Sequence, residues 1–345
     1  MAPPYPSRVP ELRVQTVLDR PPRAERDCVL YWMTAYRRVA WNFSLERAIE
    51  WAVRLGKPLV ILEALRSDYP WASDRIHQFL IQGMADNAAA LARKSVLYYP
   101  YVEPARGAGK GLLAALAARA AVVVSDDFPC FFLPRMYEAA ARQIPCRFEL
   151  VDSNGILPMR AATKVFARAV DFRRFLQKHV RDHLEAMPEP DPWSGQKLPR
   201  PAPCPDAIER RWPAADLSQL ARNAAQLAAL PIDHSVCIAP RPGGAKAAAK
   251  TLRTFLDKQL PHYIECRNQP SQEATSGLSP YLHAGHISAH QVFRDAVACD
   301  GWSAARLSRP ATGSAEGWWG TSPAVESFLD ELITWREVGF NMCHL

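Results

Sequence analysis

The most informative stretch of the chain reads Thr275-Ser276-Gly277-Leu278-Ser279-Pro280-Tyr281-Leu282-His283-Ala284-Gly285-His286-Ile287-Ser288. Its hydroxyl groups and the neighbouring backbone N–H groups could bind a phosphate, or they could only cap a helix. Pro280 stops any helix that precedes it, and Gly285 allows the backbone to turn or to approach a ligand closely. Ser288 is then placed to cap a helix that continues through Val292 and Val297. The pattern predicts the wall of a pocket, with both interpretations of the hydroxyls open.

The overall composition is that of a soluble globular protein. The chain has 345 residues, of which 48% are hydrophobic, and this length exceeds the usual limit of a single core, so two domains are expected. No window approaches the roughly 18 uninterrupted apolar residues of a membrane span. The first residues, Met1-Ala2-Pro3-Pro4-Tyr5-Pro6, lack the apolar core of a secretory signal. We therefore expect a cytoplasmic monomer without a membrane partner.

Cysteine content and net charge bear on metal or disulfide sites and on an anionic partner, and both are weak evidence. The 8 cysteines are scattered without a C-x-x-C pair, which predicts reduced thiols rather than a zinc site or a disulfide framework. The formal charge of +7 is compatible with an anionic partner such as DNA, although many basic proteins bind nothing anionic.

Residues 22–155 alternate apolar runs with helical patterns, which predicts a Rossmann-like, doubly wound parallel sheet covered on both faces. The apolar runs are residues 28–33, 58–65, 96–102, 121–125 and 147–151. Asp126 and Asp127 follow one of these runs at its carboxyl end, where they could bind a ligand or merely cap a turn. We find no G-x-G-x-x-G after the first strand and no P-loop spacing. Residues 1–21 are rich in proline and are predicted to be an extended leader outside the core.

Residues 156–240 are predicted to connect two domains. The first part is a basic helical segment that could touch DNA phosphates or could be a solvated face beside a core stripe. The second part, from Met187 to Pro213, is dense in proline and is predicted to be a linker. Helical patterns then dominate residues 241–345, which predicts an all-helical second domain.

Three histidines, His283, His286 and His290, invite comparison with a metal site because the last two are one helical turn apart. No H-E-x-x-H pattern and no suitably spaced carboxylate completes such a site, so we predict no metal and expect capping or packing roles.

Glu331 and Trp335 are four residues apart in the predicted helix 324–338 and therefore share a face. An indole can stack on an extruded base while a carboxylate accepts a hydrogen bond from it. The alternative is an aromatic core residue beside a glutamate that faces solvent. Sequence patterns alone leave both interpretations open.

The segments that start at Thr275 and at Glu331-Leu332-Ile333-Thr334-Trp335-Arg336-Glu337 together resemble the flavin-binding region of the photolyase and cryptochrome family. Further similarity is found in Pro242-Gly243-Gly244-Ala245, Tyr263, Arg267-Asn268 and Pro270, and in the first-domain runs at residues 29–33 and 57–60. The spacing resembles class II cyclobutane pyrimidine dimer photolyases rather than other branches. Nearly the whole chain is similar to such a protein.

This resemblance implies light-driven repair of DNA that contains pyrimidine dimers, by electron transfer from reduced FAD. It implies that FAD is held by Tyr263, Thr275, Ser276, Gly277, Leu278, Ser279 and Arg336. It implies that Glu331 and Trp335 contact the flipped thymine dimer. An antenna chromophore of unknown identity is possible in the first domain. The alternative is a relative that binds DNA or senses light without repair activity.

Two departures from the family pattern affect these expectations. Ala284 and His286 stand where class II proteins usually carry an aromatic residue and a glutamine. The chain stops at Leu345, whereas the family continues with helices that build the other side of the flavin cavity. We therefore expect an incomplete FAD-binding domain and a fragment or a natural truncation.

Overall fold

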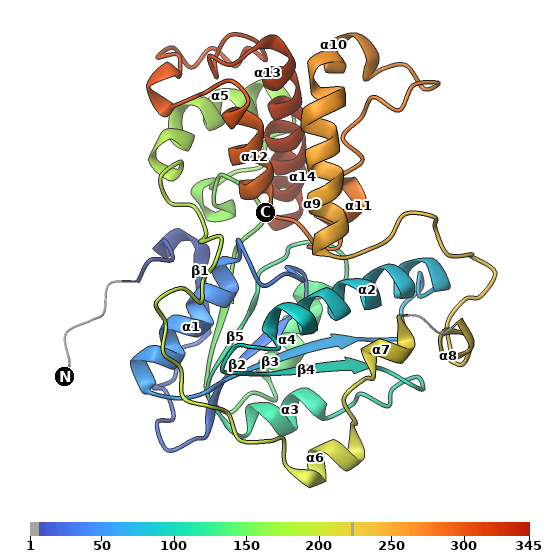
Figure 1. The fold of residues 1–345 in the computed structure, drawn as a ribbon. Coiled ribbons are helices and arrows are strands. Elements are labelled where there is room, and N and C mark those ends of the chain that lie inside the picture. Colours follow the sequence, from blue (N-terminus) through green and yellow to red (C-terminus); the bar gives the residue numbers. More distant parts are fainter. Residues whose placement is uncertain (1–6, 222–223) are drawn as a thin grey trace.

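A six-stranded sheet, built from residues 14–151, forms the lower half of the molecule in Figure 1. The computed structural model describes residues 7–221 and 224–345. The strands are β1 (Val14–Leu18), β2 (Cys28–Met33), β3 (Leu59–Leu65), β4 (Val96–Val102), β5 (Ala120–Asp126) and β6 (Arg147–Val151). They lie in the order β1-β6-β5-β2-β3-β4, and all neighbouring pairs are parallel except β1 with β6. The strand order reverses between β2 and β5, which makes their carboxyl ends the switch point of the sheet.

Helices cover both faces of this sheet, as the continuous apolar runs of the strands require. The helices α1 (Phe43–Leu55) and α2 (Asp74–Leu91) lie on one face, and α3 (Leu112–Ala117) and α4 (Leu133–Ala141) lie on the other. Alternate residues of β2 point to opposite cores: Tyr31 packs towards α1 and Trp32 towards α4. Asn42 caps α1, because its side-chain oxygen accepts hydrogen bonds from two backbone N–H groups of the first turn.

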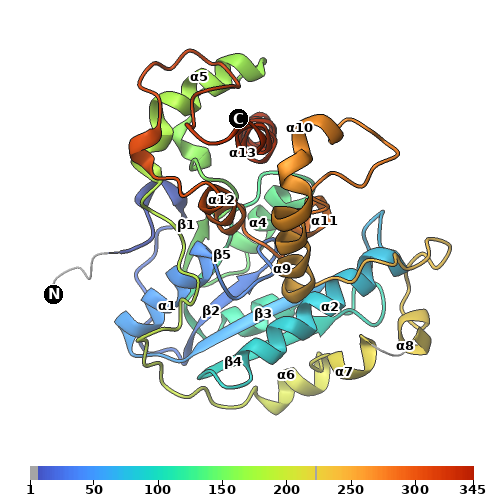
Figure 2. The same ribbon diagram turned by 45° about the horizontal axis from the view of Figure 1, so that its top comes forward.

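A helical layer stands above the carboxyl edge of the sheet (Figures 1 and 2). It contains α5 (Ala169–His179), α9 (Ala245–Thr254), α10 (Tyr263–Cys266), α11 (Ser279–His283), α12 (Ala289–Ala298), α13 (Pro323–Leu329) and α14 (Arg336–His344). One apolar core joins these helices and includes Phe172, Phe255, Phe293 and Leu329. The predicted α/β domain followed by a helical part is therefore confirmed. Within the described residues every helix is too short or too polar to span a bilayer.

The segment predicted to connect the domains divides between them. Its first part contributes α5 and the buried Leu176 and Val180 to the helical core. The later part runs back over the α/β domain as α6 (Asp206–Arg211), α7 (Leu217–Leu220) and α8 (Ala224–Ala228). The buried Trp212 packs against one face of the sheet, and its backbone carbonyl accepts a hydrogen bond of 2.5 Å from the Tyr99 hydroxyl.

The stretch predicted as a leader contains an element of the sheet. Residues 1–6 lie outside the described part of the chain, but Val14–Leu18 forms the edge strand β1 and pairs antiparallel with β6. Val17 and Leu18 pack against one core of the sheet, and Val14 packs against the other. The domain core thus begins earlier in the sequence than expected.

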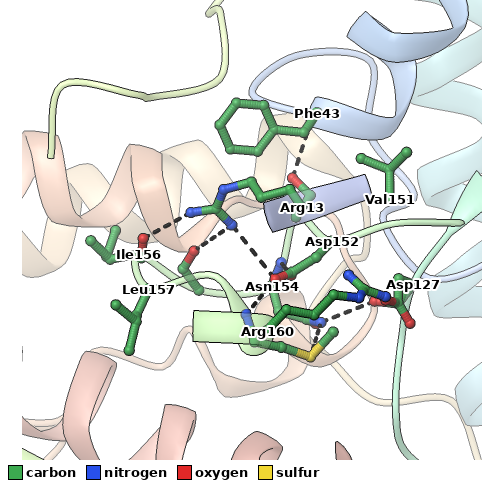
Figure 3. A network of polar contacts seen from close by, with 12 residues as sticks. Arg13, Phe43, Asp127, Val151, Asp152, Asn154, Ile156, Leu157 and Arg160 are labelled. Carbon is green, nitrogen blue, oxygen red and sulfur yellow. Dashed lines mark hydrogen bonds and ion pairs between the residues drawn. The ribbon is translucent and has the colours of Figure 1, made fainter. Parts of the chain in front are cut away.

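Arg13, directly before β1, joins the two layers through the network drawn in Figure 3. Its guanidinium is fully buried, lies 3.8 Å from Asp152, and donates hydrogen bonds to the carbonyl groups of Gly155 and Ile156. One of its nitrogens also lies 3.4 Å from His290 of α12. The buried charge is thus matched by a carboxylate and by carbonyl dipoles, as a charge in a low-dielectric interior requires.

Candidate functional site

The predicted carboxylate and indole lie in a π-helical segment, Asp330–Trp335, between α13 and α14. Leu332, Ile333 and Thr334 are buried, whereas Glu331 is exposed and 53% of Trp335 is accessible. One edge of the segment therefore completes the core, and the opposite edge presents an acid and an indole to solvent. Widened helical turns of this type are frequent at functional sites.

Arg267, just after α10, holds the exposed carboxylate in place. Its Nη1 atom lies 2.8 Å from Oε1 of Glu331, and its guanidinium lies 5.7 Å from the centre of the Tyr263 ring. Tyr263 is buried with its ring edge against Phe328 of α13. Burial raises the pKa of the Tyr263 hydroxyl, and the nearby Glu331 charge acts in the same direction. The structure thus brings Tyr263 together with Glu331.

The loop Thr275–Ser279 presents hydroxyl groups around a left-handed glycine. Thr275 and Ser279 are exposed, and Ser276 is half-buried with its hydroxyl accepting a hydrogen bond from the backbone N–H of Leu278. Leu278 has no exposed surface, so its side chain belongs to the core. Gly277 has a φ of 63°, and its carbonyl accepts a hydrogen bond of 2.7 Å from Arg241. This geometry fixes the loop and leaves two hydroxyls available to a ligand.

The two predicted halves of the site are not linked directly. Across residues 7–221 and 224–345, no hydrogen bond or ion pair joins Thr275–Ser279 to Glu331 or Trp335. Near the acid–indole pair, Arg267 contacts Glu331 of the π-helical segment, and Tyr263 contacts Phe328 of the adjoining α13. A single hollow shared by the hydroxyls and the acid–indole pair therefore stays a prediction.

Arg336, predicted to bind the cofactor, points into the junction between the layers. Its Nη1 atom donates a hydrogen bond of 2.8 Å to the carbonyl of Asn154, and its guanidinium stacks 4.6 Å from the Phe340 ring centre. Burial lowers its pKa, and the neighbouring Glu337 partly offsets this effect. Glu337 in turn accepts hydrogen bonds from the backbone N–H groups of Ile156 and Leu157. Arg336 and Glu337 therefore hold α14 against the segment that follows β6.

The three histidines have separate packing partners. His286 is buried, accepts a hydrogen bond from the backbone N–H of Gly244, and stacks on Phe79 with ring centres 5.0 Å apart. His290 packs its ring against Phe43, and His283 packs against Phe131. Burial lowers the pKa of His286 to about 3, so its ring is neutral at physiological pH.

Asp126 organises the loop that follows β2. One carboxylate oxygen accepts a hydrogen bond from the Tyr31 hydroxyl, and the other accepts from the backbone N–H groups of Thr34, Ala35 and Tyr36. Asp127 pairs with Arg160. Of the two interpretations of these carboxylates, the geometry supports the structural one.

A cavity of about 820 Å³ opens at the carboxyl ends of β2 and β3, near the switch point of the sheet. Its floor is formed by the loops after these strands, and α2, α11 and residues 239–241 complete the wall. Exposed aromatic side chains surround it, notably Trp71, Phe131 and Phe132. Trp71 and Phe131 meet edge to face with ring centres 6.0 Å apart. None of the residues predicted to bind FAD or the dimer lines this cavity.

Among the described residues, four arginines and no carboxylate line the same cavity. Arg37 pairs with the buried Glu63 at 3.0 Å, and Arg66 pairs with Asp68 at 2.6 Å. Arg75 and Arg241 donate hydrogen bonds to backbone carbonyls, and in the described part of the chain neither forms an ion pair. The cavity therefore combines flat apolar walls with uncompensated positive charge, which suits a flat aromatic anion.

Comparison with known proteins agrees with this architecture. No family model matches the chain. The deoxyribodipyrimidine photo-lyase of Methanothermobacter thermautotrophicus is 28% identical over 333 residues, which cover 96% of this chain and 65% of that protein. The deoxyribodipyrimidine photo-lyase of Oryza sativa is 27% identical, with coverage of 92% and 58%.

Two solved structures share the arrangement of elements. A class III photolyase from Agrobacterium tumefaciens superposes with a TM-score of 0.61 at 17% identity, covering 93% of this chain and 59% of that one. A cryptochrome from Synechocystis gives a TM-score of 0.54 at 14% identity, with coverage of 92% and 61%. This chain has the photolyase and cryptochrome fold. The curated relatives that the chain matches are named deoxyribodipyrimidine photo-lyases, and membership of class II stays a prediction. The chain spans between 53% and 65% of the length of the curated photo-lyases that it matches.

Within the photolyase fold, two features were not predicted from the sequence. The role of Arg267 depends on a partner that is remote in sequence, Glu331. The cavity arginines come from four separate segments and share no local motif. Only the position of the cavity, beyond the carboxyl ends of parallel strands, could have been anticipated.

Proposed function

We propose that this chain takes part in light-driven repair of cyclobutane pyrimidine dimers in DNA, as a class II-like photolyase that uses reduced FAD. The observation that carries the proposal is the exposed acid–indole pair, Glu331 and Trp335, at the edge of a π-helical segment, with Glu331 held by Arg267. The names of the curated relatives support the same reaction class.

The acid–indole pair is suited to an extruded pyrimidine dimer. The exposed face of Trp335 can stack on the flat bases, and the Glu331 carboxylate can accept hydrogen bonds from their ring N–H groups. Arg267 restricts the carboxylate to one position before a base arrives, which lowers the ordering cost of binding. These residues would bind and orient the lesion.

The hydroxyl loop fits the diphosphate and ribityl parts of FAD in its chemistry. Thr275 and Ser279 carry exposed hydroxyls without side-chain hydrogen bonds to described residues, and Gly277 lets the backbone approach closely. Tyr263 and Ser276 would complete this set. Reduced FAD, when bound, supplies the electron that splits the cyclobutane ring.

Repair by the isolated chain tests the proposal. The protein is incubated with FAD, photoreduced, mixed with an oligonucleotide that contains one thymine dimer, and exposed to blue light. Chromatography then measures the restored thymines. We expect repair by the parent chain and at least a tenfold loss in Trp335→Ala, because stacking of a base contributes about 1–3 kcal/mol. The matched control is Met342→Ala, which alters another exposed apolar residue and should retain repair.

The alternative is a relative that binds dimer-containing DNA or senses light without repairing the lesion. The high exposure of Trp335 favours it, because a repair site must exclude water from the reacting groups. Retained binding to dimer-containing DNA with no restored thymines would identify this alternative. Loss of both binding and repair would reject both proposals.

The arginine-lined cavity is a candidate site for an antenna chromophore. Its aromatic walls fit a flat ring system, and Arg75 and Arg241 fit an attached anionic group. Binding of FMN is compared with binding of riboflavin, which has the same rings and no phosphate. We expect tighter binding of FMN and about a tenfold loss in Arg75→Met. Arg93→Ala, at an exposed position outside the cavity, is the control. Equal affinity for FMN in Arg75→Met and Arg93→Ala would contradict binding of the chromophore in this cavity.

A further inference from the structure

The loop that follows β5 packs directly on the last helix. Phe128 of this loop and Phe340 of α14 meet edge to face, with ring centres 5.5 Å apart. Arg336, one turn earlier on α14, stacks on the same Phe340 ring and bonds to Asn154 of the α/β layer. The contact therefore holds one side of α14 against the loop.

Two cysteines lie within this contact. Cys130 follows Phe128 by two positions, and Cys343 follows Phe340 by three, which places Cys343 on the same side of α14. Cys130 is half-buried and Cys343 is exposed, and both carry free thiols. The Cys343 side chain is near enough to the Cys130 thiol to contribute to raising its pKa.

The geometry points to a reversible disulfide between Cys130 and Cys343, which would link the α/β layer to the helical layer. This modification site is independent of the flavin and lesion sites proposed above. The two thiols come from segments that are remote in sequence, and the Phe128–Phe340 contact joins these two segments while the thiols are reduced. A disulfide requires the two Cα atoms to lie within about 7 Å of each other, and this aromatic contact favours that approach.

Thiol–disulfide exchange with a small disulfide such as glutathione disulfide provides a balanced route. The exposed Cys343 thiolate attacks one sulfur of glutathione disulfide, forms a mixed disulfide, and releases one glutathione thiolate. Cys130 then loses its proton to solvent and attacks the Cys343 sulfur, which releases the second glutathione. Both cysteines are oxidised and one glutathione disulfide is reduced to two glutathiones. Burial, together with the neighbouring Cys343, raises the pKa of Cys130 to about 12. Cys343 is the exposed thiol of the two and is therefore the one that glutathione disulfide reaches first.

The bond would restrain the wall of the arginine-lined cavity. Phe131 and Phe132, directly after Cys130, line that cavity, and Phe131 has a backbone φ of 61°, which is uncommon for a bulky residue. A covalent link at Cys130 fixes one end of this aromatic segment to α14. Oxidation would thus stabilise the folded chain by closing a long loop.

Peptide mapping tests the disulfide without flavin, light or DNA. The full chain is reduced, desalted, treated with glutathione disulfide, alkylated and digested without reductant. We expect a linked peptide pair that contains Cys130 and Cys343, in the parent and in the control Cys237→Ser, which alters another exposed cysteine. Cys343→Ser should abolish the link. In Cys130→Ser, Cys343 should stop at the mixed disulfide with glutathione.

Thermal unfolding provides the second measurement. The oxidised parent should unfold a few degrees higher than the reduced parent, and this difference should be absent in Cys343→Ser, where the exposed site tolerates serine. The inference is overturned if the oxidised parent carries only glutathione on Cys343, or if Cys343 pairs with another cysteine. A link without any rise in the unfolding temperature would overturn the proposed restraint.

Discussion

Arg267 and Glu331 form an ion pair of 2.8 Å that joins the end of α10 to the π-helical segment. The pair is the contact through which the segment that leads to the hydroxyl loop reaches the acid–indole edge. The two side chains are 30% and 44% exposed, so the ion pair contributes little to the stability of the fold. Its main effect is to fix the position of the Glu331 carboxylate.

Replacing Arg267 should therefore change binding more than stability. We expect Arg267→Gln to lower the free energy of unfolding by less than about 1 kcal/mol, as is usual for exposed ion pairs. The same change should weaken binding to dimer-containing DNA, because the Glu331 carboxylate loses its fixed position. Urea unfolding and fluorescence anisotropy measure the two effects. A large loss of stability with unchanged binding would contradict the positional role.

Truncation at the buried edge of the π-helical segment should lower stability, whereas truncation at the exposed edge should lower lesion binding. Ile333 has no exposed surface, so Ile333→Ala should lower the free energy of unfolding by about 2–5 kcal/mol. Trp335 is 53% exposed, and Trp335→Ala should stay within about 1 kcal/mol of the parent while lowering lesion binding. Urea unfolding of both variants checks the contrast. Similar losses in the two variants would mean that Trp335 packs as a core residue.

The basic helix α5 should act chiefly in stability. Arg173 binds both carboxylate oxygens of Asp330, at 2.8 and 2.9 Å, and both side chains are mostly buried. Arg173→Ala leaves this carboxylate unpaired and should cost about 1–3 kcal/mol of unfolding free energy. The neighbouring Arg174 is 46% exposed, and Arg174→Ala should change stability by less than about 0.5 kcal/mol. Equal effects in urea unfolding would contradict the structural role of Arg173.

Acidification should lower the free energy of unfolding through the buried His77. Burial lowers its pKa from 6.5 to about 4, so between these values the unfolded chain binds a proton that the folded chain does not. The stability of the folded state therefore falls as pH falls through this window, by about 1.4 kcal/mol per pH unit. His77→Phe keeps the stacking on Tyr69 and should remove this contribution.

The comparison between parent and variant must be made at each pH. Burial raises the pKa of Glu46 to about 8 and of Glu337 to about 7, and these groups make stability fall as pH rises from about 4.5. They are unchanged by His77→Phe, so the difference between the two unfolding free energies isolates the histidine. A difference that is constant from pH 7 to pH 4 would contradict the lowered pKa.

Much of the α/β layer could be predicted because its strands are buried on both faces. Runs such as residues 28–33 and 121–125 need no alternation, and each is flanked by a helical pattern. Strand β1 escaped prediction because it lies at an edge, between prolines, with a mixed exposure pattern. Its pairing with β6 comes from backbone hydrogen bonds to a distant segment, which no local pattern encodes.

The candidate site could be predicted only as residue types, not as an arrangement. The spacing of Glu331 and Trp335 predicted a shared helical face and left the exposure of the indole open, and the π-helical turn that carries both residues has no signal in the sequence. The sequence pattern did not show that Arg336 has a different role from its neighbours. Its hydrogen bond to Asn154 depends on the contact between the two layers. The hydroxyl loop was recognised by resemblance, and its binding role stays a prediction.

The buried position of Arg13 has a consequence for the order in which the chain can fold during synthesis. Its guanidinium needs carbonyl groups at Gly155 and Ile156 and a neighbour, His290, that the ribosome makes 277 residues later. We expect a nascent α/β layer to leave this cation facing water until the helical layer emerges. Final docking of the N-terminal edge would then be one of the last steps of maturation rather than one of the first.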